Sequence, residues 1–107
     1  MSDFSAHLAN GPDGACSLKL RGEFDLAGRP LADEALAGMN GTKKIVLDLS
    51  ELVFIDSMGI QFVVTAYESA KREGRELTII RGGTQVDRVF ELVGLGDVLP
   101  FEDAARP

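Results

Sequence analysis

The chain has little of what disulfide-bonded and metal-binding proteins need. Its 107 residues contain one cysteine, one histidine and no tryptophan. A single cysteine, Cys16, excludes an internal disulfide and suits a reducing compartment. Since His7 is the only histidine, no set of cysteine and histidine ligands stands at zinc spacing. We therefore expect neither a disulfide framework nor a bound metal.

Basic residues and long apolar runs are also scarce. The chain has 11 Lys and Arg against 17 Asp and Glu, a formal net charge of −6. This balance disfavours sequence-independent binding to nucleic acid and to anionic membranes, and it is compatible with a partner that presents a basic face. No stretch approaches 18 apolar residues, and the N-terminus lacks the pattern of a secretory signal. We expect a cytoplasmic protein with no direct contact to nucleic acid or membrane.

Motifs typical of enzymes are missing as well. A Ser–His–Asp arrangement would need His7 next to Ser57, and the segment around Ser57 is not Gly-x-Ser-x-Gly. No phosphate-binding loop with its lysine is present. One minor alternative stays open: Asp25, Asp48 and Asp56 could approach one another at one end of a sheet and hold a hard cation. We expect a binding module that is not an enzyme and has no cofactor.

What the chain does have is regular hydrophobic periodicity. Alternation predicts strands over residues 4–9, 15–20, 44–49 and 76–80, with a short edge strand near 98–101. Helical spacing predicts helices from Pro30 to about residue 40, from Ser57 or Met58 to Arg72, and over residues 84–93. Strand 44–49 is expected to be buried on much of both faces, and residues 50–51 are expected to turn the chain. Thr84 and Asp87 have the spacing of a capping box.

The order of these elements is β-β-α-β-α-β-α, with a possible final strand. Two strand–helix–strand units imply parallel pairs, whereas the opening hairpin is antiparallel. We therefore predict an α/β fold in which a mixed sheet of four to five strands carries helices mainly on one face. At 107 residues the chain is expected to form one domain, residues 1–107.

The most informative stretch is Ile55-Asp56-Ser57-Met58-Gly59-Ile60, where an apolar run gives way to a helix. The first N–H groups of a helix have no internal partner, and this end of its dipole is positive. Such a place suits an anion, or a serine that becomes one. Capping by Asp56 or Ser57 is the ordinary explanation. Gly59 costs about 1 kcal/mol relative to alanine, which calls for close backbone approach or access for a partner.

This stretch, preceded by Leu47-Asp48-Leu49-Ser50-Glu51-Leu52-Val53-Phe54, resembles the signature of the STAS domain family, in particular the anti-sigma factor antagonists. Gly22-Glu23-Phe24-Asp25-Leu26-Ala27 is similar to a second motif of that family. Residues 86–95, Val-Asp-Arg-Val-Phe-Glu-Leu-Val-Gly-Leu, are similar to its third helix and Gly-Leu ending. The resemblance extends from about Leu18 to Phe101, and the three motifs stand in the family's order.

The resemblance implies a role in bacterial signalling and transcription regulation by partner switching. The unphosphorylated antagonist binds an anti-sigma factor, often a serine kinase, and frees the sigma factor. The kinase phosphorylates the antagonist and ends the contact. Carried over to this chain, the phosphorylation site is Ser57. The implied partner-binding residues are Asp25, Asp56, Ser57, Met58, Gly59 and Ile60.

One departure from the family pattern concerns Met58, which stands where members commonly carry a second hydroxyl. Either Ser57 is the switch, or the chain has lost phosphate control and is an interaction module that binds without phosphorylation. STAS domains also occur as accessory subunits of transporters, which is a further alternative. The sequence does not set the oligomeric state.

Overall fold

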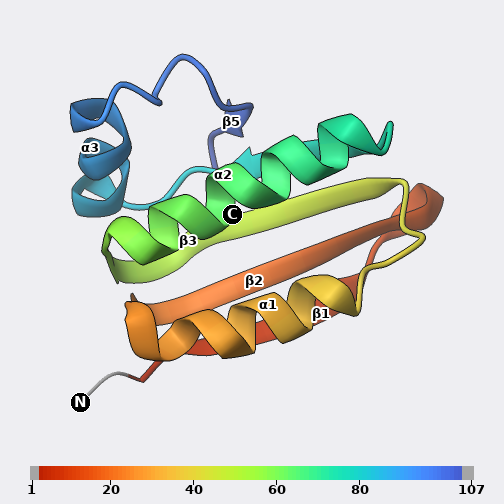
Figure 1. The fold of residues 1–107 in the computed structure, drawn as a ribbon, viewed down its shortest axis with the longest axis horizontal. Helices are drawn as coiled ribbons and strands as arrows, with labels where there is room; N and C mark the ends of the chain where they lie inside the picture. The colour runs from red at the N-terminus through yellow and green to blue at the C-terminus, as the bar shows by residue number, and fades with distance from the viewer. Residues whose placement is uncertain (1–2, 105–107) are drawn as a thin grey trace.

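The computed structural model describes residues 3–104 and contains one five-stranded sheet (Figure 1). The strands lie in the order β1-β2-β3-β4-β5, with β1 antiparallel to β2 and the other neighbours parallel. The predicted mixed α/β sheet is confirmed. The elements are β1 (Ser5–Asn10), η1 (Pro12–Gly14), β2 (Ala15–Phe24), η2 (Leu26–Gly28), α1 (Arg29–Ala37), β3 (Lys44–Ile55), α2 (Ser57–Arg72), β4 (Glu76–Ile80), α3 (Thr84–Leu92) and β5 (Phe101–Glu102).

The core lies between the sheet and its helices, on one face of the sheet. Figure 1 shows α1 and α2 lying side by side in front of the strands. Leu18, Leu20 and Leu47 point into this layer and are fully buried. On the opposite face of β3, Val46 and Asp48 are only half-buried, so the prediction of burial on both faces was wrong. This face is therefore partly open to water.

β3 is longer than predicted and contains two bulges. Its twelve residues pair with the ten of β2, and the register shifts between Lys19 and Arg21 and again between Gly22 and Glu23. Each extra residue moves the following side chains to the other face. The buried positions are therefore spaced by two and then by three; they are Ile45, Leu47, Leu49, Leu52 and Ile55. The expected turn at residues 50–51 was wrong because the strand continues past a bulge between Asp48 and Glu51.

The helices follow the prediction in position but not in every detail. α2 spans Ser57–Arg72 as predicted. In α1 the buried side chain is Ala32, whereas Leu31 is 45% exposed. The capping box at the start of α3 was also wrong. Gly83, which has no side chain, is the N-cap in place of Thr84, so no hydroxyl caps the helix. Asp87 pairs with Arg81 at 3.1 Å.

The carboxyl ends of β2 and β3 lie next to each other. β2 runs four residues past its predicted end, to Phe24, which is fully buried and contacts Phe62 of α2 edge to face. Phe24 is paired with Ile55, the last residue of β3.

Among residues 3–104, no helix is long and apolar enough to cross a membrane.

Candidate functional site

The predicted site residues meet at the carboxyl ends of β2 and β3. Asp25 follows β2 directly and Asp56 follows β3, and the two strands are parallel neighbours. The backbone N–H of Asp56 donates a hydrogen bond to the carbonyl oxygen of Phe24 at 3.1 Å. Since the ends of parallel strands share one edge of a sheet, this bond brings the segments around Asp25 and Asp56 together.

Asp56 is the N-cap of α2. Its Oδ1 accepts hydrogen bonds from the backbone N–H groups of Met58 at 3.0 Å and Gly59 at 3.1 Å. These are donors that a helix start leaves without a partner. The anion position that the sequence predicted at this helix start is therefore filled by the chain's own carboxylate.

Ser57 is the first helical residue and is exposed. Within residues 3–104 its hydroxyl has no hydrogen-bond partner, because the capping role belongs to Asp56. The hydroxyl is thus open to a reagent or to another protein. Met58 and Ile60 on either side of Gly59 are half-buried.

Gly59 is buried, and its missing side chain lets α2 lie against the sheet. A Cβ at this position would stand 2.6 Å from Cγ1 of Ile55 and 3.1 Å from Cγ of Phe24. Close backbone approach therefore explains this glycine. The buried Gly59 positions the exposed residues before it, and its part in partner binding stays a prediction.

Arg29, which sequence reasoning missed, links the two segments of the site. Its Nη1 donates to the carbonyl oxygen of Met58 at 3.3 Å, and its Nε bonds Oδ1 of Asp33 at 3.0 Å. The guanidinium also lies over the ring of Phe62, 5.7 Å from its centroid. The side chain is 20% exposed. Arg29 thus ties the start of α1 to the first turn of α2.

Asp25 begins the other segment, and apolar side chains accompany both. The Oδ1 of Asp25 accepts a hydrogen bond from the N–H of Ala27 at 3.1 Å, which caps η2. Next to it, Leu26 is 65% exposed. On β3, Val53 is 61% exposed and Phe54 is 47% exposed. An apolar run too long for one face of a strand was the sequence signal for this exposure.

The first bulge of β3, between Asp48 and Glu51, is held by charged side chains. Oδ1 of Asp48 accepts from the backbone N–H and the hydroxyl of Ser50, at 2.9 and 2.6 Å. Glu51 pairs with Lys19 at 2.9 Å and Arg21 at 2.7 Å. The hydrogen bond between Lys19 and Glu51 lowers the pKa of Glu51 and raises the pKa of Lys19.

The alternative of a cation site built from Asp25, Asp48 and Asp56 is wrong. Asp48 lies in the middle of β3 and is engaged with Ser50, and Lys19 stands 3.8 Å from its Oδ2. Asp25 and Asp56 lie at the strand ends and cap η2 and α2. The three carboxylates therefore do not converge on one point.

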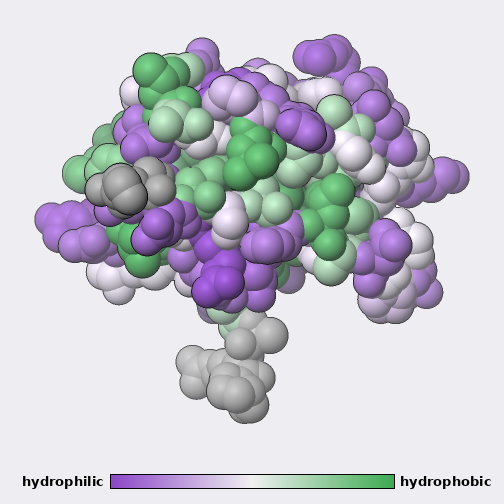
Figure 2. Space-filling view, turned by 90° about the horizontal axis from the view of Figure 1, so that it is seen from below, coloured by the Kyte–Doolittle hydropathy of each residue, from purple (hydrophilic) through white to green (hydrophobic). Residues whose placement is uncertain are grey.

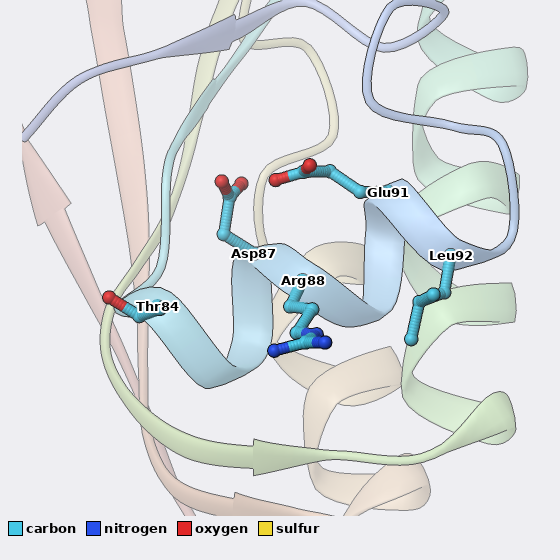
Figure 3. Close-up of a pocket in the computed structure, with 5 residues that line it drawn as sticks. All are labelled: Thr84, Asp87, Arg88, Glu91 and Leu92. Carbon is cyan, nitrogen blue, oxygen red and sulfur yellow. The ribbon is translucent and has the colours of Figure 1, made fainter.

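A separate open hollow of about 580 Å³ lies along α3 (Figure 3). Five side chains of this one helix line it: Thr84, Asp87, Arg88, Glu91 and Leu92. None of the predicted site residues belongs to this set. With both acids and an arginine on a single wall, the hollow shows no convergent chemistry for one ligand class.

Comparison with known proteins relates this chain to one family. The family model described as "Mlab, STAS domain" matches residues 7–100. The anti-sigma-B factor antagonist of Staphylococcus aureus is 30% identical over 91 residues, which cover 83% of this chain and 84% of that protein.

Two solved structures share the fold. The crystal structure of an anti-sigma factor antagonist from Mycobacterium paratuberculosis has a TM-score of 0.86, with 22% identity, 95% coverage of this chain and 87% of that chain. The Bacillus cell fate determinant SpoIIAA in its phosphorylated form has a TM-score of 0.68, with 20% identity and coverages of 95% and 93%.

Proposed function

The chain belongs to the STAS domain family, and on that premise we propose that it is an anti-sigma factor antagonist. In this role it acts without catalysis: it binds an anti-sigma factor and so frees a sigma factor. The name and the coverage of the Staphylococcus aureus relative support this role over that of a transporter subunit.

The contact surface of this proposal is the edge where β2 and β3 end. It consists of exposed or half-buried side chains of three kinds. They are the apolar Leu26, Val53, Phe54, Met58 and Ile60, the acidic Asp25 and Asp56, and the hydroxyl of Ser57. Exposed apolar side chains supply anchors that bury on binding, and the carboxylates around them suit a partner with a basic face. The chain's net charge of −6 favours the same kind of partner.

We further propose that the partner is a serine kinase that phosphorylates Ser57. The observation that carries this step is the exposed Ser57 hydroxyl, next to helix amides that Asp56 already occupies. A phosphoryl group brings about −1.5 to −2 charges at neutral pH. At most helix starts free N–H groups would stabilise this charge. Here the amides of Met58 and Gly59 are taken, so the charge adds to that of Asp56 and faces the partner.

The test is binding and phosphorylation with the kinase-type anti-sigma factors of the same organism. Titration calorimetry with the unmodified chain should show a complex. Incubation with kinase and ATP, followed by mass spectrometry, should place the phosphate on Ser57. Ser57→Ala should bind and resist the switch, whereas Ser57→Asp should lower affinity by about tenfold or more.

Gln61→Glu is the matched control, because it adds one negative charge on α2 a turn further along, at an exposed position. It should change affinity less than Ser57→Asp does. A folded chain that binds none of the anti-sigma factors would refute the antagonist role. Binding without any phosphate on Ser57 would refute the switch alone and leave the interaction module that Met58 suggests.

A further inference from the structure

The free edge of β1 lacks the features that normally keep sheet edges apart. β1 is an edge strand, paired only with β2, and its sequence Ser-Ala-His-Leu-Ala-Asn contains no acidic residue, lysine, arginine or proline. Residues 7–10 are all exposed. Charges, prolines and bulges are the usual means by which proteins protect such an edge. The other edge, β5, has only two residues and is followed by Asp103, which pairs with Arg81.

An apolar side chain stands on the helix side of this edge. Leu8 is 44% exposed and lies against α1, since a Cβ on Gly38 would stand 3.1 Å from its Cδ1. Leu31, 45% exposed, precedes Gly38 by seven residues and so lies on the same side of α1. Figure 2 views the molecule from below the orientation of Figure 1, the side on which β1 and α1 lie. It shows hydrophobic residues interspersed across the middle of that side.

From these features we propose that two copies of the chain associate through β1, antiparallel, into one continuous ten-stranded sheet. The two-fold axis is perpendicular to the sheet, so both helix layers lie on the same side. In the proposed register Leu8 faces Leu8 of the second copy, and Ala6 faces Asn10. This inference does not depend on the proposed function, because Leu8, at the centre of the pairing, lies opposite Leu18 of β2, seven residues before Asp25.

The alternation of side chains selects this register. Ala6 and Leu8 lie on the helix side because their partners Leu20 and Leu18 are buried, and His7 points to the other face. Residues that face each other across an antiparallel pair must share a face. A pairing centred on Leu8 places the two exposed leucines about 5 Å apart. It also uses residues 7–10, which are all exposed. Centring on His7 would place two ionisable rings opposite each other.

The β1 edge is a part of the surface where a second copy meets little charge repulsion. Each chain has a net charge of −6, so most of its surfaces repel their own copy. In the proposed register no acidic or basic side chain of β1 lies opposite a like charge on β1 of the second copy. A seam of this length is small beside the about 1,600 Å² of a standard interface, so the dimer should be weak. Added salt should strengthen it, because salt screens the repulsion between the two acidic chains.

Sedimentation equilibrium on the full chain tests the association. We expect a monomer–dimer equilibrium that shifts toward dimer at higher salt. Leu8→Lys places like charges opposite each other and should raise the dimer dissociation constant by about tenfold or more. Leu92→Lys is the control: Leu92 is 75% exposed on α3, and its replacement should leave the constant unchanged.

Disulfide trapping tests the register. Leu8→Cys should form a disulfide-linked dimer on mild oxidation, whereas His7→Cys, diagonal to its copy, should link much less. The native Cys16 is buried, so the unmodified chain serves as the blank. A chain that stays monomeric at millimolar concentration, a dimer that Leu8→Lys does not weaken, or linkage through His7→Cys in preference to Leu8→Cys would overturn the proposal.

Discussion

The two bulges of β3 lie one after the other, yet they are built in different ways. The first, between Asp48 and Glu51, is held by side chains: Asp48 bonds Ser50, while Lys19 and Arg21 hold Glu51. The second, between Leu52 and Phe54, exposes the apolar side chains of Val53 and Phe54 to water. Opposite it on β2, Gly22 has a φ of +89° and lies against the backbone of Asp3.

This difference separates a structural role from the proposed binding role on one strand. The first bulge stabilises its own geometry with charge pairs on the open face of the sheet. The apolar side chains of the second bulge are largely exposed and so contribute little to the core. Large apolar side chains that are not needed for the core are available for contact with another protein. Substitutions at the two bulges should therefore affect different measurements.

The largest effect should come from Gly22→Ala. A side chain at this φ is strained, and its Cβ would overlap the backbone of Asp3, so we expect a loss of about 2–4 kcal/mol in the free energy of unfolding. Gly41→Ala is the control, since Gly41 has a similar φ of +87° with no atom within 4 Å of the added Cβ. Urea denaturation of both variants measures the difference. Equal losses would show that strain alone matters and that the close packing at Gly22 does not.

Phe54→Ser should lower the affinity for the anti-sigma factor by about 10- to 100-fold, because a central aromatic anchor is lost. Stability should change little, since the ring is 47% exposed. Calorimetric titration measures the affinity, with Leu92→Ser on α3 as the control. Unchanged binding by Phe54→Ser would remove the second bulge from the contact surface.

At the first bulge, Asp48→Ala should lower stability by about 1 kcal/mol, because the N–H and hydroxyl of Ser50 both lose their acceptor. Ser50→Ala, which removes the hydroxyl bond alone, should have a smaller effect. Thermal unfolding measures both variants. Affinity for the anti-sigma factor should stay the same, and a loss of binding by Asp48→Ala would contradict the division between the two bulges.

The smallest effect concerns Glu51→Gln and should depend on pH. The pKa of Glu51 is lowered in the folded chain, chiefly by its hydrogen bond with Lys19. Its contribution to stability is therefore present above the unfolded pKa and is lost as the pH falls through the folded value. Glu51→Gln should be slightly less stable than the unmodified chain near neutral pH, and the two should converge in acid, once the pH lies below the folded pKa of Glu51. A gap that persists in acid would mean that charge is not its cause.

The bulges also show what sequence patterns can and cannot predict. Simple alternation placed β1, β4 and the first half of β3, because there each residue changes face in turn. The predicted strand ended at Leu49 because an extra residue of β3 interrupts the alternation there. That extra residue is recognised only from the pairing of β3 with β2. The capping box at Thr84 failed for a related reason: Arg81 competes for Asp87 from outside the helix.

The candidate site was predicted in the same uneven way. Asp56 and Ser57 could be located because their motif is contiguous and begins a helix. Arg29 was missed because its contact with Met58 joins residues 29 apart in the chain. The exposure of Phe54 was missed because the apolar run that contains it does not show which of its side chains face water; the two bulges decide that. Reasoning from one sequence finds residues that act next to one another, and the fold supplies the distant partners.

The first turn of α2 also has a consequence for timing. Asp56 caps its amides, Gly59 seats it on Ile55 and Phe24, and Arg29 holds the carbonyl of Met58. A turn restrained at three points has little conformational search left when a partner arrives. The diffusional encounter of the two proteins should then set the association rate. A phosphate on Ser57 should mainly shorten the lifetime of the complex. The speed of any such response would follow the turnover of the modifying enzyme, with no delay from refolding.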